Sequence, residues 1–263
     1  MVALTVAACS RTELVYENAD WFGAWRIADY LELSSEQRGR LRDGLAAYQG
    51  FHRENRLPAI NDYLERVDTL LARPAPQKAE VRALFADGED LIKTNIRDLI
   101  PLTAELLMEL NTEQISALET TLAEGREAYL ERLATDREAR AMDRTQDWIG
   151  PLQPEQRQTL TQCVADMPNV TEPWQEWRQQ TEQELISLLR NEAPQTDVEA
   201  LLEGWLLEDA ARSPALQAYR QTARTLWQQC THAMLTTLTP EQRQHARQRL
   251  KGYRGDLETV AAR

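Results

Sequence analysis

Apolar residues recur every three to four positions along most of this chain, which is the spacing of one face of an α-helix. Two clear stripes are Leu41, Leu45, Tyr48 and His52, and Ile115, Leu118, Leu122, Tyr129 and Leu133. No stretch alternates apolar and polar residues with the period of two that a half-buried strand shows. Because 42% of the 263 residues are hydrophobic, the chain can bury a sizeable core. We predict an all-α fold, an antiparallel and partly kinked helical bundle.

Prolines and glycines divide these stripes. We expect Pro58 to bend or restart a helix, residues 73–76 to form a loop, and Pro101 to kink a long helix. The strongest break is at Gly150 and Pro151. We therefore predict an N-terminal helical half over 10–148 and a C-terminal helical half over 149–263, which together could pack as one domain.

One five-residue phrase occurs four times. Each copy begins with leucine and ends with the pair Glu-Gln. Its copies are Leu33-Ser34-Ser35-Glu36-Gln37, Leu110-Asn111-Thr112-Glu113-Gln114, Leu152-Gln153-Pro154-Glu155-Gln156 and Leu238-Thr239-Pro240-Glu241-Gln242. A side chain such as Ser34 can accept from the amide of the next turn, while the glutamine answers back, which completes a capping box. The phrase predicts four helix starts.

The fourth copy, residues 238–242, also resembles the Leu-Thr-x-x-Gln motif of the Spy/CpxP-type periplasmic proteins. That family is helical, binds unfolded proteins and acts in envelope stress. The resemblance implies an alternative function, a periplasmic chaperone that binds unfolded clients. Helix capping explains the motif equally well, and we give it more weight.

The N-terminus is apolar, is rich in small residues and stops at a cysteine. Val6-Ala7-Ala8-Cys9 resembles the lipobox of bacterial lipoproteins, in which the cysteine is acylated and the preceding peptide is removed. We read residues 1–9 as a truncated signal peptide, with Cys9 as the lipidation site. By the sorting rules of that class, Ser10 implies the outer membrane, facing the periplasm.

No basic residue precedes this apolar run, as one does in a signal peptide. Either Met1 is a misassigned internal start or part of the leader precedes it. The alternative to a lipobox is a frayed apolar N-terminus with an incidental cysteine.

Two further cysteines, Cys163 and Cys230, are available for a disulfide in an oxidising compartment. Cys230 also lies on an apolar stripe with Leu226 and Met234, so a buried free thiol explains it equally well. The cysteine spacings fit no metal motif.

The first 60 residues resemble an uncharacterised family of helical bacterial lipoproteins, a domain of unknown function. The residues that carry this resemblance are Cys9, Ser10, Leu14, Tyr16, Asn18, Asp20, Trp21, Trp25, Asp29, Tyr30, Leu33, Gln37, His52, Arg53, Leu57 and Pro58. Where that family has an indole before the His-Arg pair and an acidic residue before Leu-Pro, this chain has Phe51 and Arg56. The resemblance implies an envelope lipoprotein and no known activity.

The densest polar cluster near aromatic residues is Trp25, Asp29, Tyr30, His52 and Arg53. Asp29 could pair with His52 or Arg53 across two helices, more plausibly as a structural ion pair than as a catalytic dyad. The sequence contains no phosphate-binding loop, nucleophile elbow or paired metal-ligand motif. We predict no catalytic residue, metal or cofactor, and no enzymatic activity.

The formal net charge of −12 disfavours binding to nucleic acid. The last predicted helix nevertheless carries Arg243, Arg247, Arg249, Lys251 and Arg254, which could face anionic lipid or form a solvated face. We predict a lipid-anchored envelope protein of scaffold or interaction type, with a periplasmic protein partner or client.

Overall fold

The computed structural model describes residues 27–134 and 137–262, and it confirms the predicted all-α fold. No strand occurs in these two ranges. After a helical turn at residues 27–30, the helices are α3 Ser35–Asn55, α4 Leu57–Leu71, α5 Lys78–Met108, α6 Thr112–Ala134, α7 Arg137–Ile149, α8 Pro154–Ala165, α9 Thr171–Arg190, α10 Gln195–Leu207, the 3-10 turn η1 Asp209–Ala211, α11 Pro214–Thr237 and α12 Pro240–Ala261. None of these described helices has the length and apolar character that spanning a membrane requires.

The proline and glycine breaks fall largely where the sequence predicts them. Pro58 is the second residue of α4, and the loop between α4 and α5 contains residues 73–76. Gly150 has a positive φ of 81° in the loop between α7 and α8, a conformation that glycine adopts without a steric penalty. Pro101 does not end its helix, because α5 continues through it to Met108.

The buried residues gather at two ends of the molecule, which we call the lower pole and the upper pole. The lower-pole core includes Leu33, Leu41, Ile100, Ala104, Leu118, Ile186, Val198 and Leu202. The upper-pole core includes Leu70, Val81, Leu84, Leu238 and Leu250, with a neighbouring cluster of Leu152, Leu160, Cys230 and Met234. The helices pack closely at these two ends and diverge between them.

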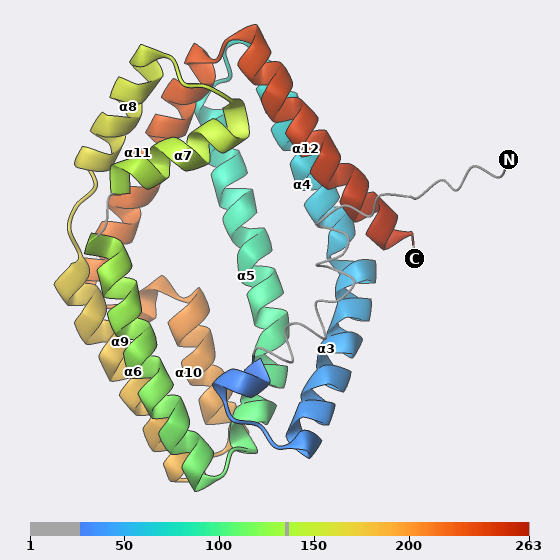
Figure 1. Ribbon diagram of the computed structural model, residues 1–263, viewed down its shortest axis with the longest axis vertical. Coiled ribbons are helices and arrows are strands. Elements are labelled where there is room, and N and C mark those ends of the chain that lie inside the picture. Colours follow the sequence, from blue (N-terminus) through green and yellow to red (C-terminus); the bar gives the residue numbers. More distant parts are fainter. Residues whose placement is uncertain (1–26, 135–136, 263) are drawn as a thin grey trace, which may run out of the picture.

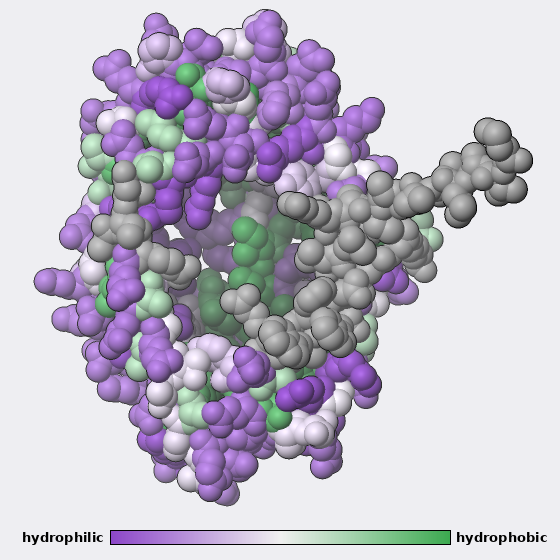
Figure 2. Space-filling model, viewed as in Figure 1, coloured by the Kyte–Doolittle hydropathy of each residue, from purple (hydrophilic) through white to green (hydrophobic). Residues whose placement is uncertain are grey.

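Helix α5 joins the two poles, since its 31 residues span about 46 Å. It packs on α3 and α4 on one side and on α10 and α11 on the other, so helices from both predicted halves contact it. Figure 1 shows the result as a ring of helices. In the space-filling view the ring is hollowed between the poles, and hydrophobic residues line part of the hollow (Figure 2).

The four copies of the repeated phrase meet in two pairs, and a buried glutamine of one copy bonds the glutamine of the other. At the upper pole, the Nε2 of Gln156 donates to the Oε1 of Gln242 at 2.8 Å, and Gln242 returns the same bond at 2.9 Å. Each Nε2 also donates to a carbonyl that precedes the partner phrase, that of Thr237 or Pro151. Gln156 is fully buried. We call this arrangement the upper clasp.

The lower clasp repeats this pattern with Gln37 and Gln114. The two hydrogen bonds between the glutamine side chains measure 3.1 and 2.8 Å. Gln37 also donates to the carbonyl of Glu109, and Gln114 donates to the carbonyl of Glu32. In both clasps each glutamine Oε1 also accepts from the backbone N–H three residues earlier. The predicted helix starts are therefore confirmed, and the glutamines also join distant parts of the chain.

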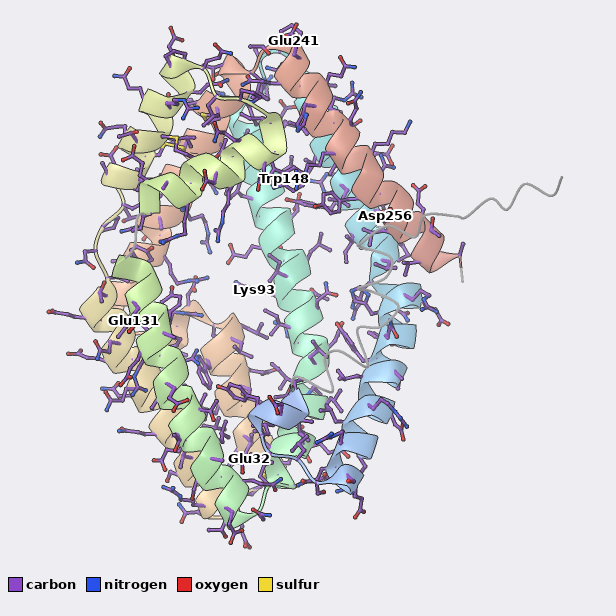
Figure 3. All side chains as sticks on the ribbon, in the orientation of Figure 1. Glu32, Lys93, Glu131, Trp148, Glu241 and Asp256 are labelled. Carbon is purple, nitrogen blue, oxygen red and sulfur yellow. A yellow bond between two sulfur atoms is a disulfide. The ribbon has the colours of Figure 1, made fainter. Side chains whose placement is uncertain are left out.

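A disulfide joins Cys163 on α8 to Cys230 on α11, with a Cα–Cα distance of 6.1 Å. Figure 3 shows its sulfur atoms between these two helices, near the upper pole. The bond ties together two helices that also pack on each other.

Candidate functional site

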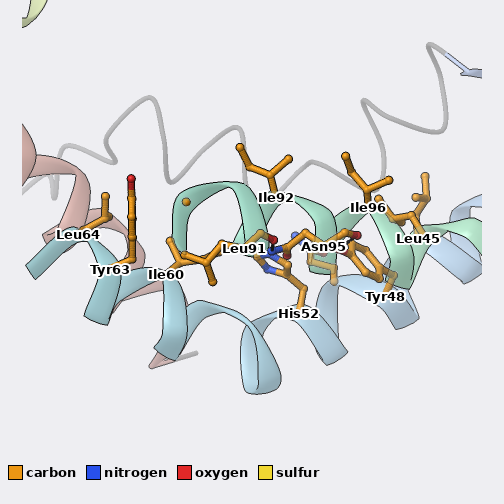
Figure 4. Close-up of a pocket in the computed structure, with 13 residues that line it drawn as sticks. Leu45, Tyr48, His52, Ile60, Tyr63, Leu64, Leu91, Ile92, Asn95 and Ile96 are labelled. Carbon is orange, nitrogen blue, oxygen red and sulfur yellow. Dashed lines mark hydrogen bonds between the residues drawn. The ribbon is translucent and has the colours of Figure 1, made fainter. Parts of the chain in front are cut away.

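An apolar groove opens between α3, α4 and α5, at the level of the molecule where the two cores do not meet. Its volume is about 650 Å³. The residues that line it are Leu45, Tyr48, Gln49, His52, Ile60, Tyr63, Leu64, Gly88, Leu91, Ile92, Asn95, Ile96 and Leu99. We call it the central groove. Figure 4 shows Tyr63 and Leu64 toward one end, Tyr48 and Leu45 toward the other, and His52 and Asn95 between them.

The apolar face of α5 is wider than its neighbours can cover. In the sequence, an apolar stripe predicts a buried face made of Phe85, Ile92, Ile96, Leu99, Leu106 and Leu110. Ile92 is 63% exposed, so for this residue the prediction is wrong. Helix α3 ends and α4 begins at Arg56, and both helices pack on the same side of α5. Their side chains leave Ile92 uncovered. The stripe alone could not reveal this, because periodicity shows which residues share a face and not whether another helix covers it.

Gly88 brings Tyr63 close to α5. A Cβ atom at position 88 would lie 2.7 Å from the Tyr63 hydroxyl, closer than real Cβ contacts. The absence of a side chain thus allows the phenol ring to lie across the end of the groove. Burial raises the pKa of Tyr63, so this hydroxyl stays protonated near neutral pH.

The groove has few polar groups, and two of them donate hydrogen bonds to backbone carbonyls of α5. The hydroxyl of Tyr48 donates to the backbone carbonyl of Asn95 at 3.3 Å, and the Asn95 amide donates to the carbonyl of Leu91 at 2.7 Å. Burial lowers the pKa of His52, an effect that Asn95 partly opposes. The neutral imidazole is therefore the favoured form at neutral pH, which keeps the groove wall uncharged.

The two positions at which the chain departs from the lipoprotein pattern lie beside each other at the groove. The guanidinium of Arg56 lies 5.0 Å above the ring of Phe51 and forms two hydrogen bonds to Asp98, of 2.5 and 3.0 Å. This contact ties the junction of α3 and α4 to α5. Arginine over an aromatic ring is a stabilising arrangement in its own right, so the two departures are coupled.

The structure does not bring the predicted polar cluster together. Trp25 lies outside the described residues. Asp29 is exposed and has no hydrogen bond or ion pair to His52 or Arg53, both of which, like Asp29, lie in the described range. Tyr30 lies near Gly125 of α6. His52 lies in the last turn of α3, about 25 Å along the helix axis from Ser35, where α3 begins. Asp29 and Tyr30 therefore belong to the lower pole, and His52 belongs to the groove.

The basic residues of α12 are mostly occupied by contacts within the chain. Arg243 donates to four backbone carbonyls at the ends of α4 and α11, at 2.5 to 3.1 Å. Arg247 forms two bonds to Asp68, and Arg249 donates to the Asp147 carbonyl while lying over Trp148. Arg254 faces Glu65 and Glu258. These arginines fasten α12 to its neighbours.

Other predicted sites have different outcomes. Cys9 lies outside the described residues, and Cys163 and Cys230 form the disulfide described above. Within the described ranges, no group of three or more His, Cys, Asp or Glu residues is arranged to hold a metal ion. A polar hollow between α4 and α12 is larger, at about 870 Å³, but the central groove has the more apolar lining.

Comparison with known proteins gives one match. A family model described as a family of unknown function (DUF6279) matches residues 29–208, which include all three walls of the central groove and both glutamines of the lower clasp. No curated protein and no solved structure matches the chain. The predicted resemblance to an uncharacterised family is confirmed by this match, while the likeness to Spy/CpxP-type proteins stays a prediction based on the motif alone. The chain belongs to the family of unknown function DUF6279.

Proposed function

We propose that this protein is a lipid-anchored binding protein of the bacterial envelope, without catalytic activity, that holds an apolar segment of a partner protein in the central groove. The observation that carries the proposal is the exposed apolar wall of the groove, above all Ile92. Contiguous exposed apolar surface in a concave site is typical of binding sites for apolar ligands or protein segments.

The lipobox supports the anchored part of the proposal. Acylation at Cys9 would place the protein at a membrane surface, and Ser10 favours the outer membrane facing the periplasm. Seventeen residues separate Cys9 from residue 27, enough chain to hold the ring away from the lipid surface. The disulfide fits the same location, because such bonds persist in the periplasm.

The charge of the chain indicates the chemistry of the partner. A net charge of −12 attracts basic proteins and repels acidic ones. The groove itself offers apolar contact with few polar groups. The partner segment we expect is therefore apolar within the groove and carries basic residues on its flanks.

A second candidate function is a chaperone with many clients. The low number of polar groups in the groove favours it, because apolar contact discriminates weakly between sequences. A photo-cross-linking residue at Ile92 would distinguish the two in the native envelope. One discrete adduct would support a dedicated partner, and a broad range of adducts would support a chaperone.

Reduced lysozyme tests the groove, since it is a basic protein that exposes apolar segments and aggregates. We expect the protein to suppress this aggregation, as followed by light scattering, and Ile92→Glu to remove most of the suppression. The matched control is Leu206→Glu, which also places a carboxylate at an exposed apolar position but on α10. Equal suppression by both variants would reject the groove as the binding site.

The anchor has its own test. Protein purified from native membranes should begin at Cys9 and carry the mass of acyl chains, and Cys9→Ser should lose that mass and leave the membrane fraction. An unmodified chain that still begins at Met1 would contradict the lipoprotein proposal.

A further inference from the structure

We propose that a pocket between α6, α7, α9 and α11 binds a small organic acid, in which a carboxylate is joined to a flat ring. The pocket has a volume of about 260 Å³ and shares no lining residue with the central groove. We call it the arginine pocket. The lining residues that carry the argument are Tyr129, Arg137, Trp174, Trp177, Arg212 and Arg220.

The charge of the arginine pocket is opposite to that of the whole chain. Three arginines line it, and among the described residues no aspartate or glutamate does. The chain as a whole has a formal net charge of −12. A site of this sign on an acidic protein attracts anions, which the rest of the surface repels.

The positive charge near the pocket exceeds the negative charge that balances it. Arg212, Arg220 and Arg224 share the carboxylate of Asp209, at 3.1, 2.5 and 3.7 Å. Glu89 is the second carboxylate of this network, and it pairs with Arg224 at 2.6 Å and also with a lysine. Four cations therefore share two carboxylates. A bound anion would reduce this excess of positive charge.

Two of the arginines retain hydrogen-bond donors for a ligand. Within the described chain, Arg220 uses only its Nε–H in a hydrogen bond, toward Asp209 at 2.5 Å, and its Nη2 lies 3.9 Å from Glu89. Arg137, the first residue of α7, forms no hydrogen bond or ion pair with another described residue. The planar fork of arginine matches a carboxylate through two parallel N–H groups. The pocket can therefore bind a carboxylate directly.

Arg212 supplies a charge that the protein holds in place. Its side chain is 9% exposed, donates to the carbonyls of Trp205 and Glu208, and lies 5.2 Å from the centre of the Trp177 ring. Burial lowers the pKa of Arg212, and the charge of Arg220 acts in the same direction. An anion bound beside these two arginines would offset both effects.

Aromatic side chains form other walls of the pocket and suit a flat ring. Trp174 packs on Tyr129 with 4.2 Å between the ring centroids, and the indole N–H of Trp177 donates to the Ala211 carbonyl at 3.3 Å. Rings held in this way can stack on a planar group or meet it edge to face. The volume is below the range of about 300–1,000 Å³ that drug-sized ligands occupy. The ligand we expect is therefore one or two rings with a single acid group.

Isothermal titration calorimetry tests the pocket in a Cys9→Ser chain that retains the disulfide. The probes are naphthalene-2-carboxylate, an aromatic acid, and glucuronate, a sugar acid, and each is compared with its neutral amide. We expect at least one acid to bind at a single site, and its amide to bind at least about tenfold more weakly. Binding of naphthalene-2-carboxylate would identify an aromatic acid, and binding of glucuronate a sugar acid. If neither acid binds, or if acid and amide bind equally, the inference is overturned.

Variants locate the bound acid. Arg220→Gln should weaken its binding at least about tenfold, because a charged hydrogen bond is lost. Arg82→Gln is the matched control, since Arg82 is exposed on α5 and does not line the pocket. We expect the control to change the affinity by less than about twofold, because salt screens a distant charge.

Arg137→Gln keeps the test independent of any change in folding. Arg137 has no hydrogen bond or ion pair with the described chain to lose, and we expect its replacement to weaken binding at least about threefold. If both Arg220→Gln and Arg137→Gln bind the acid as tightly as the parent chain, the inference is overturned. Loss of binding in Ile92→Glu but not in Arg220→Gln would place the probe in the central groove and would also overturn it.

Discussion

The buried glutamines of the repeated phrase form hydrogen bonds between copies that lie far apart in the sequence. A capping glutamine at the surface would satisfy one backbone amide. Here Gln156 takes part in four hydrogen bonds, to Gln242 twice, to the Thr237 carbonyl and from the Gln153 amide. The sequence predicts the local cap but not the pairing, because the paired glutamines lie 77 and 86 residues apart and nothing local selects the partner.

Gln156→Leu should strongly destabilise the fold. The change leaves the Gln242 amide, the Thr237 carbonyl and the Gln153 amide without their partners, and each unsatisfied buried group costs about 1–3 kcal/mol. We expect a loss of about 3 kcal/mol or more in the free energy of unfolding, measured by urea denaturation. Gln248→Leu, at an exposed position of α12, should change it by less than about 0.5 kcal/mol.

The double variant with Gln156→Leu and Gln242→Leu separates pairing from general disruption. Since both amides are then removed together, the loss should be smaller than the sum of the two single losses. Additive losses would show that the two glutamines act independently.

His52 makes stability depend on pH. Burial lowers its pKa below the ordinary 6.5, with Arg56 acting in the same direction and Asn95 and Asp98 opposing it. Below about pH 6.5 the unfolded chain binds a proton that the folded state resists, so this residue lowers the free energy of unfolding as pH falls from 7 to 5.

His52→Gln should therefore lose less stability between pH 7 and pH 5 than the parent protein does. Urea denaturation at the two pH values measures the difference, and the common titration of carboxylates cancels in it. A variant that loses as much as the parent would show that His52 has the same pKa in both states.

At the scale of the helices, local sequence predicts much of what is seen. The breaks at Pro58, 73–76 and Gly150 and the starts of α8 and α12 follow from turn and capping chemistry. The groove could not be predicted, because it depends on how α3, α4 and α5 diverge. One local sign existed, which is the glycine in the stripe of α5 at position 88, opposite Tyr63.

Two glycines in helices test that close approach. Gly39→Ala should stabilise the protein by up to about 1 kcal/mol, because alanine favours helix and nothing lies within 4 Å of the new methyl group. Gly88→Ala should gain less or lose stability, because its methyl group must displace Tyr63. Urea denaturation of both variants checks this, and equal stabilisation would show that Tyr63 moves aside at no cost.

At the scale of the whole molecule, two separate cores predict local rather than uniform responses to mutation. Leu202 lies in the lower-pole core and Leu250 in the upper-pole core, and both are nearly fully buried. Replacement of a buried leucine by alanine costs about 2–5 kcal/mol. We expect Leu202→Ala to speed amide hydrogen exchange mainly in α10, and Leu250→Ala mainly in α12.

Exchange followed by mass spectrometry on both variants gives the result. The parent chain supplies the baseline for each helix. If either change speeds exchange equally at both poles, the molecule unfolds as one unit, and α5 transmits the loss from one end to the other.

The disulfide has a consequence for the order in which the chain folds, because it is nested inside the upper clasp. The loop that Gln156 and Gln242 close is 86 residues long, and the cystine bridge at Cys163 and Cys230 lies within it. Once the disulfide has formed, the loop that the upper clasp must close is shortened to about 20 residues. The entropic contribution to the free energy of loop closure then falls by about 1.3 kcal/mol. The lower clasp closes a 77-residue loop that contains neither cysteine. Oxidation should therefore accelerate closure of the upper clasp and leave the rate at the lower clasp unchanged.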